Sequence, residues 1–243
     1  LLLLSIYNFD VIQMQKIHVI TPVKDSIELS LQTIQSVCNS QTSMPFVYTV
    51  YNDFSTEENT QKLQQASQEF GFELINLSSI TSTPSPNYLL VLQLAQQKAI
   101  DEDAALVIVE SDVLVQTNTL QALIDTAQQK SDAGMVASIT VDESGNVNYP
   151  YLFAKKIKGL VKPTNKHVSF CCTLLSLRYL KAYSFTSLQP DKNWYDVHIS
   201  RQSRQLGFVN YLLGNHPVVH RPHSSRPWKQ LKYSNPIKYY WLK

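Results

Sequence analysis

Ala104-Ala105-Leu106-Val107-Ile108-Val109-Glu110-Ser111-Asp112 is the stretch of this 243-residue chain from which its fold class can be predicted. The first six residues are all apolar, as is typical of a strand buried on both faces of a parallel sheet. Open α/β sheets bind ligands at the carboxyl ends of their strands, where Glu110 and Asp112 follow. In an extended chain these two carboxylates share one side. They can therefore hold Mg²⁺ or Mn²⁺ and leave other positions to phosphates and water. The alternative is a pair of solvated charges that close the strand.

Strands and helices alternate around this stretch in the first half of the chain. Short apolar runs predict strands, and apolar residues at helical spacing predict helices between them. The alternation predicts an α/β fold with a doubly wound, Rossmann-like, mostly parallel sheet. The predicted strands cover residues 17–20, 46–51, 73–77 and 104–109, and the predicted helices cover 27–38, 55–70, 86–99 and 119–129.

The second half of the chain predicts a more mixed arrangement. Residues 135–141 and 147–153 flank a Ser-Gly turn, which is typical of a β-hairpin. An apolar segment at 168–177 and a helix at 194–206 follow.

Domain boundaries follow from the same pass along the chain. Because no repeat or low-complexity linker interrupts it, we expect one domain at residues 16–228. Residues 1–15 are expected to be a non-native or disordered extension, with Met14 as the natural start. Residues 229–243 form a basic aromatic tail, in which lysines alternate with tyrosines and tryptophans.

Polar residues also follow the earlier strands. Asn52 and Asp53 end the second predicted strand and can accept hydrogen bonds from a nucleotide base or ribose. The alternative is a turn that leads into a helix capped by Ser55. Asp25 has the same ambiguity, because its spacing to Glu28 is that of a capping box.

A candidate general base lies late in the chain. Asp196 follows Trp194 and Tyr195 at the predicted start of a helix. Aromatic neighbours can raise the pKa of a carboxylate and suit it to accept a proton. The alternative is an acid placed in the first turn by the helix dipole, and Asp191 competes for the capping role.

The segment from His220 to Trp228 is rich in potential ligands. His220 can complete a metal site, and Arg221 and Arg226 can bind a diphosphate. The alternative is a polar surface loop. Because the spacing to His223 fits no zinc module and the cysteines are distant in sequence, a structural zinc site is not expected.

Composition excludes several classes of protein. The net charge is only +2, so no global basic field favours nucleic acid. Residues 197–243 nevertheless carry eight basic and no acidic residues, which suits a negatively charged partner. Three cysteines, two of them adjacent, fit no disulfide framework, and no apolar run is long enough to span a bilayer. With six glycines there is no Gly-rich phosphate loop, so phosphates must be held by metal and side chains.

Taken in order, these segments resemble the family 2 glycosyltransferases of GT-A fold. Each motif is weak alone, but the order and spacing of five of them are typical of that family. The resemblance covers about residues 16–228 and rests on Val19–Asp25, Val50–Thr56, Val107–Asp112, Tyr195–Val197 with Gly207, and Val218–His220.

The chain departs from the family pattern at several of these positions. Asn52 replaces the first acid of the family's D-D-G-S-T segment, and Phe54 replaces its glycine. Glu110 replaces the first acid of D-x-D, so Asp112 is the safer metal ligand. Tyr195 and His198 replace the acids on either side of the base, which leaves Asp196 as the base candidate there.

The resemblance implies a role for each matching position. It implies an acceptor base at Asp196 and a divalent cation, Mn²⁺ or Mg²⁺, at Glu110 and Asp112, which His220 can complete. The residues expected to bind the nucleotide-sugar are Thr21, Pro22, Asp25, Asn52, Asp53, Ser111, Arg221 and Arg226.

The implied activity is inverting transfer of a sugar. A UDP-sugar is the expected donor because it is the frequent donor in that family. The implied acceptor is a saccharide or a lipid-linked saccharide, in a cytoplasmic protein whose tail can touch the inner face of the cell membrane. Two alternatives remain open. One is a non-catalytic saccharide- or nucleotide-binding module on a decayed transferase scaffold. The other is a nucleotidyltransferase of related fold, which would usually need the missing Gly-rich loop.

Overall fold

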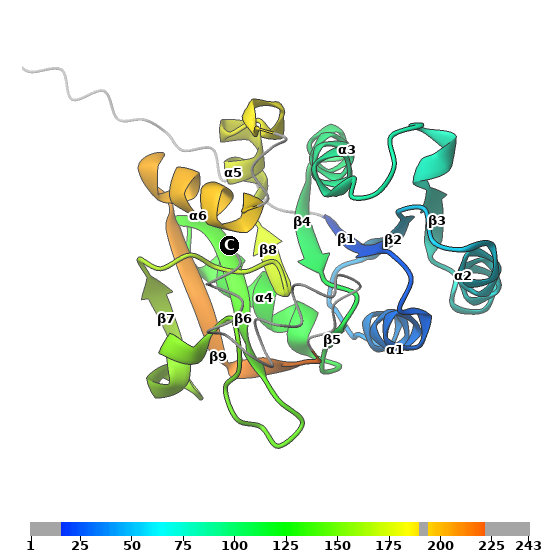
Figure 1. Ribbon diagram of the computed structural model, residues 1–243. Coiled ribbons are helices and arrows are strands. Elements are labelled where there is room, and N and C mark those ends of the chain that lie inside the picture. Colours follow the sequence, from blue (N-terminus) through cyan, green and yellow to red (C-terminus); the bar gives the residue numbers. More distant parts are fainter. Residues whose placement is uncertain (1–15, 190–193, 222–243) are drawn as a thin grey trace, which may run out of the picture.

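The computed structural model describes residues 16–189 and 194–221 (Figure 1). Helices pack on both faces of a nine-stranded sheet, whose order is β3-β2-β1-β4-β8-β6-β9-β5 with β7 also paired to β9. The strands are β1 (Lys16–Val23), β2 (Phe46–Asn52), β3 (Glu73–Asn76), β4 (Ala104–Val109), β5 (Val113–Leu114), β6 (Ala133–Val141), β7 (Val161–Thr164), β8 (Cys172–Leu175) and β9 (Val209–His220). The helices are α1 (Ile27–Cys38), α2 (Glu57–Phe70), α3 (Tyr88–Asp101), α4 (Thr119–Gln129), α5 (Leu177–Ala182) and α6 (Tyr195–Gln205), with 3-10 turns η1 (Leu77–Ser79), η2 (Leu152–Ile157) and η3 (Phe185–Ser187).

The predicted α/β class and the predicted mixture of parallel and antiparallel pairing are confirmed. Strands β1 to β4 are mutually parallel, whereas β8 runs antiparallel to both β4 and β6. One apolar core lies under α1, α2 and α4, and a second lies under α3, α5 and α6. The sheet is therefore covered on both faces, which explains why all six residues of β4 are buried.

The predicted hairpin at 135–141 and 147–153 is wrong in its second strand. Val147 forms a single bridge to Val141, and η2 begins at Leu152. Pro150 has no N–H to donate to a ladder, so a strand cannot continue through it. Strand β6 pairs with β8 and β9 instead.

The predicted caps, by Asp25 on α1 and by Ser55 on α2, are also wrong. The residue before α1 is Ser26, which is left-handed and makes no side-chain cap. Asp25 caps the neighbouring helix α2 instead, since its Oδ1 accepts from Thr56 N at 2.9 Å and from Asn59 Nδ2 at 3.0 Å. The N-cap of α2 is Thr56, while the Ser55 hydroxyl accepts from Asp25 N at 2.9 Å. Sequence spacing identified the right helices but not the contact between two turns that are distant in sequence.

Helix α6 is held against the sheet at a glycine. A Cβ at Gly134 would lie 2.2 Å from Ser203 Oγ, so no other residue allows α6 to approach β6 this closely. The Ser203 hydroxyl donates to Asn210 Oδ1 at 2.7 Å, which ties α6 to β9 as well. This packing fixes the C-terminal part of α6 against β6 and β9.

Several predictions lie outside the described residues: the extension at 1–15, the tail at 229–243, Asp191, and Arg226 with His223. Strand β1 runs through Thr21 and Pro22, three residues beyond its predicted end. Within the described part of the chain no helix is long and apolar enough to cross a bilayer.

Candidate functional site

Asn52 lies at the carboxyl end of β2 and is 3% exposed. Its Nδ2 donates to Thr60 Oγ1 at 2.9 Å and to Asn76 Oδ1 at 2.8 Å. Its Oδ1 accepts from Ser55 N at 3.1 Å. The side chain thus holds β2, β3 and α2 together, and a role in binding a base stays a prediction.

Asp53 fastens the loop that precedes α3. Its carboxylate accepts from Ser85 Oγ at 2.7 Å, from Asn87 N at 2.9 Å and from Asn87 Nδ2 at 2.7 Å. Only 8% of the residue is exposed. The loop at 81–87 is therefore anchored at the end of β2, beside the predicted nucleotide contacts.

Thr21, Pro22 and Asp25 lie at the end of β1. The Thr21 hydroxyl is fully buried and accepts from Tyr48 Oη at 2.8 Å, while Pro22 is half-buried beside Tyr51. The Asp25 pKa is lowered: burial would raise it, but hydrogen bonds from Thr56 and Asn59 outweigh that effect. These residues lie at the carboxyl end of β1 and just beyond it, and their polar atoms make protein contacts there, so a role in binding the nucleotide-sugar stays a prediction.

Glu110, Ser111 and Asp112 form a turn and not the extended segment that was predicted. Val113 N donates to Glu110 O at 3.2 Å, which closes the turn after β4. The chain then enters β5, which pairs antiparallel with β9 and sets Val113 opposite His220. The turn keeps the two carboxylates near each other and brings Asp112 to the end of β9.

His220 meets the carboxylates from the far side. Its Nδ1 lies 2.8 Å from Tyr149 O, and its Nε2 lies 3.5 Å from Asp112 Oδ2. Burial lowers the His220 pKa, but the charges of Asp112 and Glu110 raise it more, so the net shift is upward. The Tyr149 carbonyl orients the ring, as second-shell acceptors commonly do for metal-binding histidines.

Cys171 is a residue that sequence reasoning missed. Its Sγ lies 3.3 Å from Glu110 Oε2, and Glu110 N donates to Cys171 O at 3.1 Å. The potential ligand atoms of Glu110, Cys171 and His220 all lie within 4.8 Å of one another. One of the cysteines that are distant from His220 in sequence is therefore close to it in the folded protein. The antiparallel pairing of β8 with β4 brings Cys171 here, and no local sequence signal predicts that pairing.

The electrostatics of this cluster favour a cation. Burial, and then the charge of Asp112, raises the Glu110 pKa to about 7. Two carboxylates held together disfavour their own ionised forms, and a divalent cation removes that repulsion. Carboxylate oxygen, imidazole nitrogen and thiol sulfur are all donors that such ions accept. The residues present fit a divalent metal.

Tyr88 is a second residue that was missed. Its ring stacks on Tyr195 at 6.3 Å between centroids. Its hydroxyl oxygen is buried and has no hydrogen-bond partner among the described residues. Burial, followed by the charges of Glu110 and Asp196, raises its pKa. A buried, unsatisfied hydroxyl beside the carboxylates is available to a ligand.

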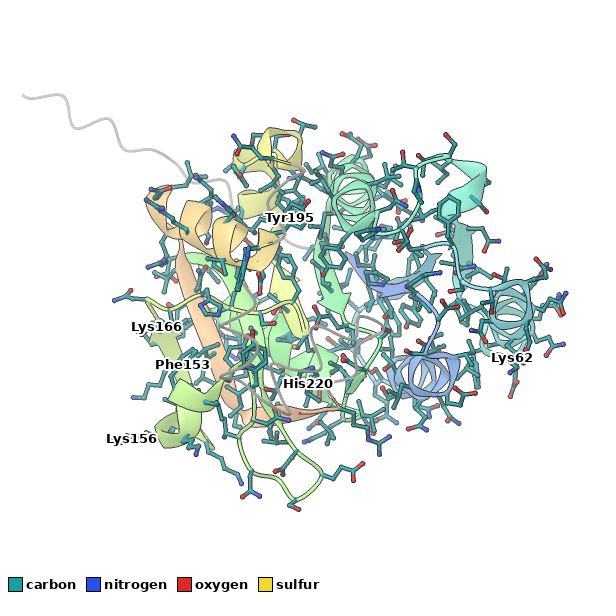
Figure 2. The ribbon with its side chains drawn as sticks, in the orientation of Figure 1. Lys62, Phe153, Lys156, Lys166, Tyr195 and His220 are labelled. Carbon is teal, nitrogen blue, oxygen red and sulfur yellow. The ribbon has the colours of Figure 1, made fainter. Side chains whose placement is uncertain are left out.

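Asp196 lies in the first turn of α6, as predicted. Its charge contributes to the raised pKa values of both Glu110 and Tyr88, and a role for Asp196 as the base stays a prediction. Tyr195 is buried, whereas Trp194 is 50% exposed. In Figure 2 Tyr195 and His220 lie in the central part of the molecule, away from both lateral edges.

The remaining candidates lie at the rim. Ser111 is partly exposed in the turn after β4. Arg221 N donates to Asp112 O at 2.9 Å, while its side chain pairs with Glu143 at 2.8 Å and donates to Gln32. The guanidinium therefore already has protein partners, and a role in binding diphosphate stays a prediction.

Comparison with protein families gives one match over most of the chain. The sequence model of the family described as "Glycosyl transferase family 2" matches residues 18–184. The chain belongs to glycosyl transferase family 2. The match includes the turns after β1, β2 and β4 and also Cys171. It ends before α6 and β9, so Asp196 and His220 lie outside it.

Solved structures of GT-A transferases share the fold of this family 2 chain. S. aureus TarS 1–349 superposes with a TM-score of 0.62 at 14% identity, covering 84% of this chain and 60% of that one. The mannosyltransferase PcManGT from Pyrobaculum calidifontis, in complex with GDP-Man and Mn²⁺, gives 0.65 at 11% identity, covering 90% and 60%. GalNAc-T7 with UDP, GalNAc and Mn²⁺ gives 0.65 at 12% identity, covering 88% and 45%. The chain thus spans less than two thirds of each of these proteins. A comparison with curated proteins finds no match.

Proposed function

We propose that this family 2 protein is an inverting glycosyltransferase that uses a nucleotide-sugar donor and a divalent cation. The observation that carries the proposal is the convergence of Asp112 and Glu110 with His220. Their elements meet only in the folded sheet, at the strand ends where α/β folds bind ligands.

The cation, Mn²⁺ or Mg²⁺, would be held by Glu110, Asp112 and His220. When bound, it offsets the charge that develops on a leaving diphosphate. Cys171 lies beside these ligands, and we propose that it contributes when a softer ion occupies the site. The described residues include no Gly-rich phosphate-binding loop. In this proposal the cation therefore provides much of the diphosphate recognition.

The proposed donor is a UDP-sugar. Support comes from TarS in complex with UDP-GlcNAc and GalNAc-T7 with UDP, although PcManGT was solved with GDP-Man. In this proposal the turns that carry Asp25, Asn52 and Asp53 border the nucleotide. The Tyr88 hydroxyl, which has no hydrogen-bond partner among the described residues, donates a hydrogen bond to the nucleotide-sugar. Ser111 and the arginines Arg221 and Arg226 complete the donor contacts.

Asp196 is the proposed general base. It would take the proton of the acceptor hydroxyl as that oxygen attacks the anomeric carbon from the side opposite the diphosphate. Direct displacement of this kind inverts the anomeric configuration. The proposed acceptor is a saccharide or lipid-linked saccharide, used in the cytoplasm or at the inner face of the cell membrane.

One observation favours a second function. The side chains of Asn52, Asp53 and Arg221 are engaged within the protein, which also suits a non-catalytic binding module on a decayed scaffold. Release of UDP from UDP-sugars in the presence of Mn²⁺ separates the two functions. The transferase should release UDP by slow hydrolysis and faster with acceptor, whereas a binding module should bind donor and release none.

A further inference from the structure

The segment formed by η2 and β7 exposes apolar and basic side chains together. Leu152, Phe153 and Leu160 are 54%, 45% and 48% exposed, which places them among the most exposed large apolar residues described. Five lysines lie between residues 155 and 166, and all are exposed. We name this the η2–β7 surface. Figure 2 shows Phe153, Lys156 and Lys166 on one lateral edge of the molecule, opposite Lys62.

The lysines of this surface are not neutralised by ion pairs among the described residues. Residues 144–189 contain seven basic and no acidic residues. None of the five lysines makes an ion pair within the described chain. Glu143 pairs with Arg221, and Asp142 accepts hydrogen bonds from Ser144 N and Asn146 N in its own turn. The acidic residues nearest to the lysines in sequence thus have other partners.

Protection of a sheet edge explains only part of the pattern. Lysines on an edge strand discourage pairing with other chains, and among the described strands β7 pairs with β9 alone. That accounts for Lys162 within β7. It does not account for Leu152, Phe153 and Leu160, which lie outside the strand. Exposure of these apolar side chains to water is unfavourable and needs another explanation.

We propose that the η2–β7 surface docks on an anionic lipid bilayer. Exposed apolar side chains interspersed with lysines along one segment suit the interface between headgroups and acyl chains, where the rings and chains insert and the ammonium groups meet lipid phosphates. A soluble polyanion would use the lysines but leave the apolar residues in water. The lipid surface is therefore the partner that uses both features.

The surface adjoins the candidate site. Phe153 packs edge-on against buried Tyr151 at 6.0 Å, and two residues earlier the Tyr149 carbonyl contacts His220. Docking would hold this wall of the site against the bilayer. The proposal names the surface by which the chain would reach a membrane, and it does not depend on the glycosyl transfer proposed above.

The test measures binding of the full chain to vesicles of phosphatidylcholine mixed with phosphatidylglycerol, and to phosphatidylcholine alone. The parent should bind only the anionic vesicles, and more weakly as salt rises. Replacing Lys155 and Lys156 by Gln should lower partitioning by at least about tenfold, since each lysine near an anionic surface is worth about fivefold. Serine at Leu152, Phe153 and Leu160 together should also lower it at least about tenfold.

A matched control changes the opposite end of the sheet. Ile80→Ser removes an exposed apolar residue that follows η1, next to β3 at that end of the sheet order, and Lys62→Gln removes a lysine of α2. Together they should alter partitioning by less than about twofold. Phe153→Trp tests docking directly, without a loss of binding. The substitution adds tryptophan fluorescence to that of the parent, and brominated lipid should quench the added fluorescence. The proposal is overturned if both surface variants bind like the parent or if the control loses as much. It is equally overturned if the added fluorescence of Phe153→Trp is not quenched, or if the chain binds dextran sulfate but no vesicle.

Discussion

The Nε2 atom of His220 lies 3.5 Å from Oδ2 of Asp112. This contact joins the end of β9 to the turn that follows β4. Arg221 N donates to Asp112 O at 2.9 Å on the same side. Together these contacts close the site around Glu110 and Cys171. Substitutions among these residues should weaken metal binding while the protein remains folded.

Asp112→Ala should abolish the enhancement of UDP binding by Mn²⁺. The carboxylate is the proposed main ligand, and its loss should weaken Mn²⁺ affinity by at least about tenfold. Titration calorimetry with and without Mn²⁺ measures both effects. Asp125→Ala, an exposed change on α4, is the control. Equal enhancement by Mn²⁺ in the parent and in Asp112→Ala would rule out this ligand.

Cys171→Ser should change metal preference more than metal binding itself. Thiolate favours softer ions, so Zn²⁺ affinity should fall by at least about tenfold while Mn²⁺ affinity changes by less than about threefold. In the parent, Co²⁺ should give near-ultraviolet thiolate charge-transfer absorption. Cys172→Ser is the control, because Cys172 is the adjacent buried thiol. The ligand role is wrong if the absorption persists in Cys171→Ser or disappears only in Cys172→Ser.

Tyr88→Phe should separate stability from donor binding. Removing a buried, unsatisfied hydroxyl should leave the metal-free protein as stable or about 1 kcal/mol more stable, whereas UDP with Mn²⁺ should bind about threefold to tenfold more weakly. Thermal unfolding and calorimetry measure the two quantities.

Tyr179→Phe is the matched control for that experiment, because the Tyr179 hydroxyl donates to Ile199 O at 2.6 Å. It should lose about 1 kcal/mol of stability without loss of UDP affinity. If Tyr88→Phe destabilises the protein like Tyr179→Phe and binds UDP normally, the Tyr88 hydroxyl has a structural role only.

Asp196→Asn should leave donor and metal binding nearly unchanged and lower turnover by at least about 10²-fold, because general-base assistance typically contributes that much. Steady-state kinetics and the anomeric configuration of the product test the assignment. Asp191→Asn is the comparison. If it abolishes turnover while Asp196→Asn keeps it within a few-fold, Asp191 is the base. Retention of configuration would exclude direct displacement.

Acidification should destabilise the protein through His18, which is 1% exposed on β1. Burial lowers its pKa, and the Glu102 carboxylate at 3.2 Å offsets only part of that effect. Below the unfolded value of about 6.5 the unfolded chain binds the proton more readily. The free energy of unfolding should therefore fall as pH drops through 6.5 toward the folded pKa, by at most about 1.4 kcal/mol per pH unit from this group.

Urea unfolding between pH 5 and pH 8 measures this dependence. His18→Gln should flatten it, and Glu102→Gln should deepen it, because the carboxylate raises the His18 pKa. An unchanged slope in His18→Gln would assign the dependence to other groups.

The first half of the fold could be predicted because its signals are local. The apolar run at β4, the helical spacing of α1 and Gly71 at the end of α2 each act within a few residues. Alternation of such elements leaves few topologies open. The carboxylates after β4 could be placed at a ligand-binding edge for the same reason.

The assembled site was decided by the tertiary structure. Pairing of β8 with β4 brought Cys171 to Glu110, and pairing of β9 with β5 brought His220 to Asp112. Asp25 likewise caps a helix that begins beyond the next strand. Short apolar strands can pair with many others of similar composition. Only the joint burial of both sheet faces selects one arrangement, and that selection depends on the whole chain. The sequence by itself determined which elements form and which side chains end them, and the packed sheet determined which of those side chains meet.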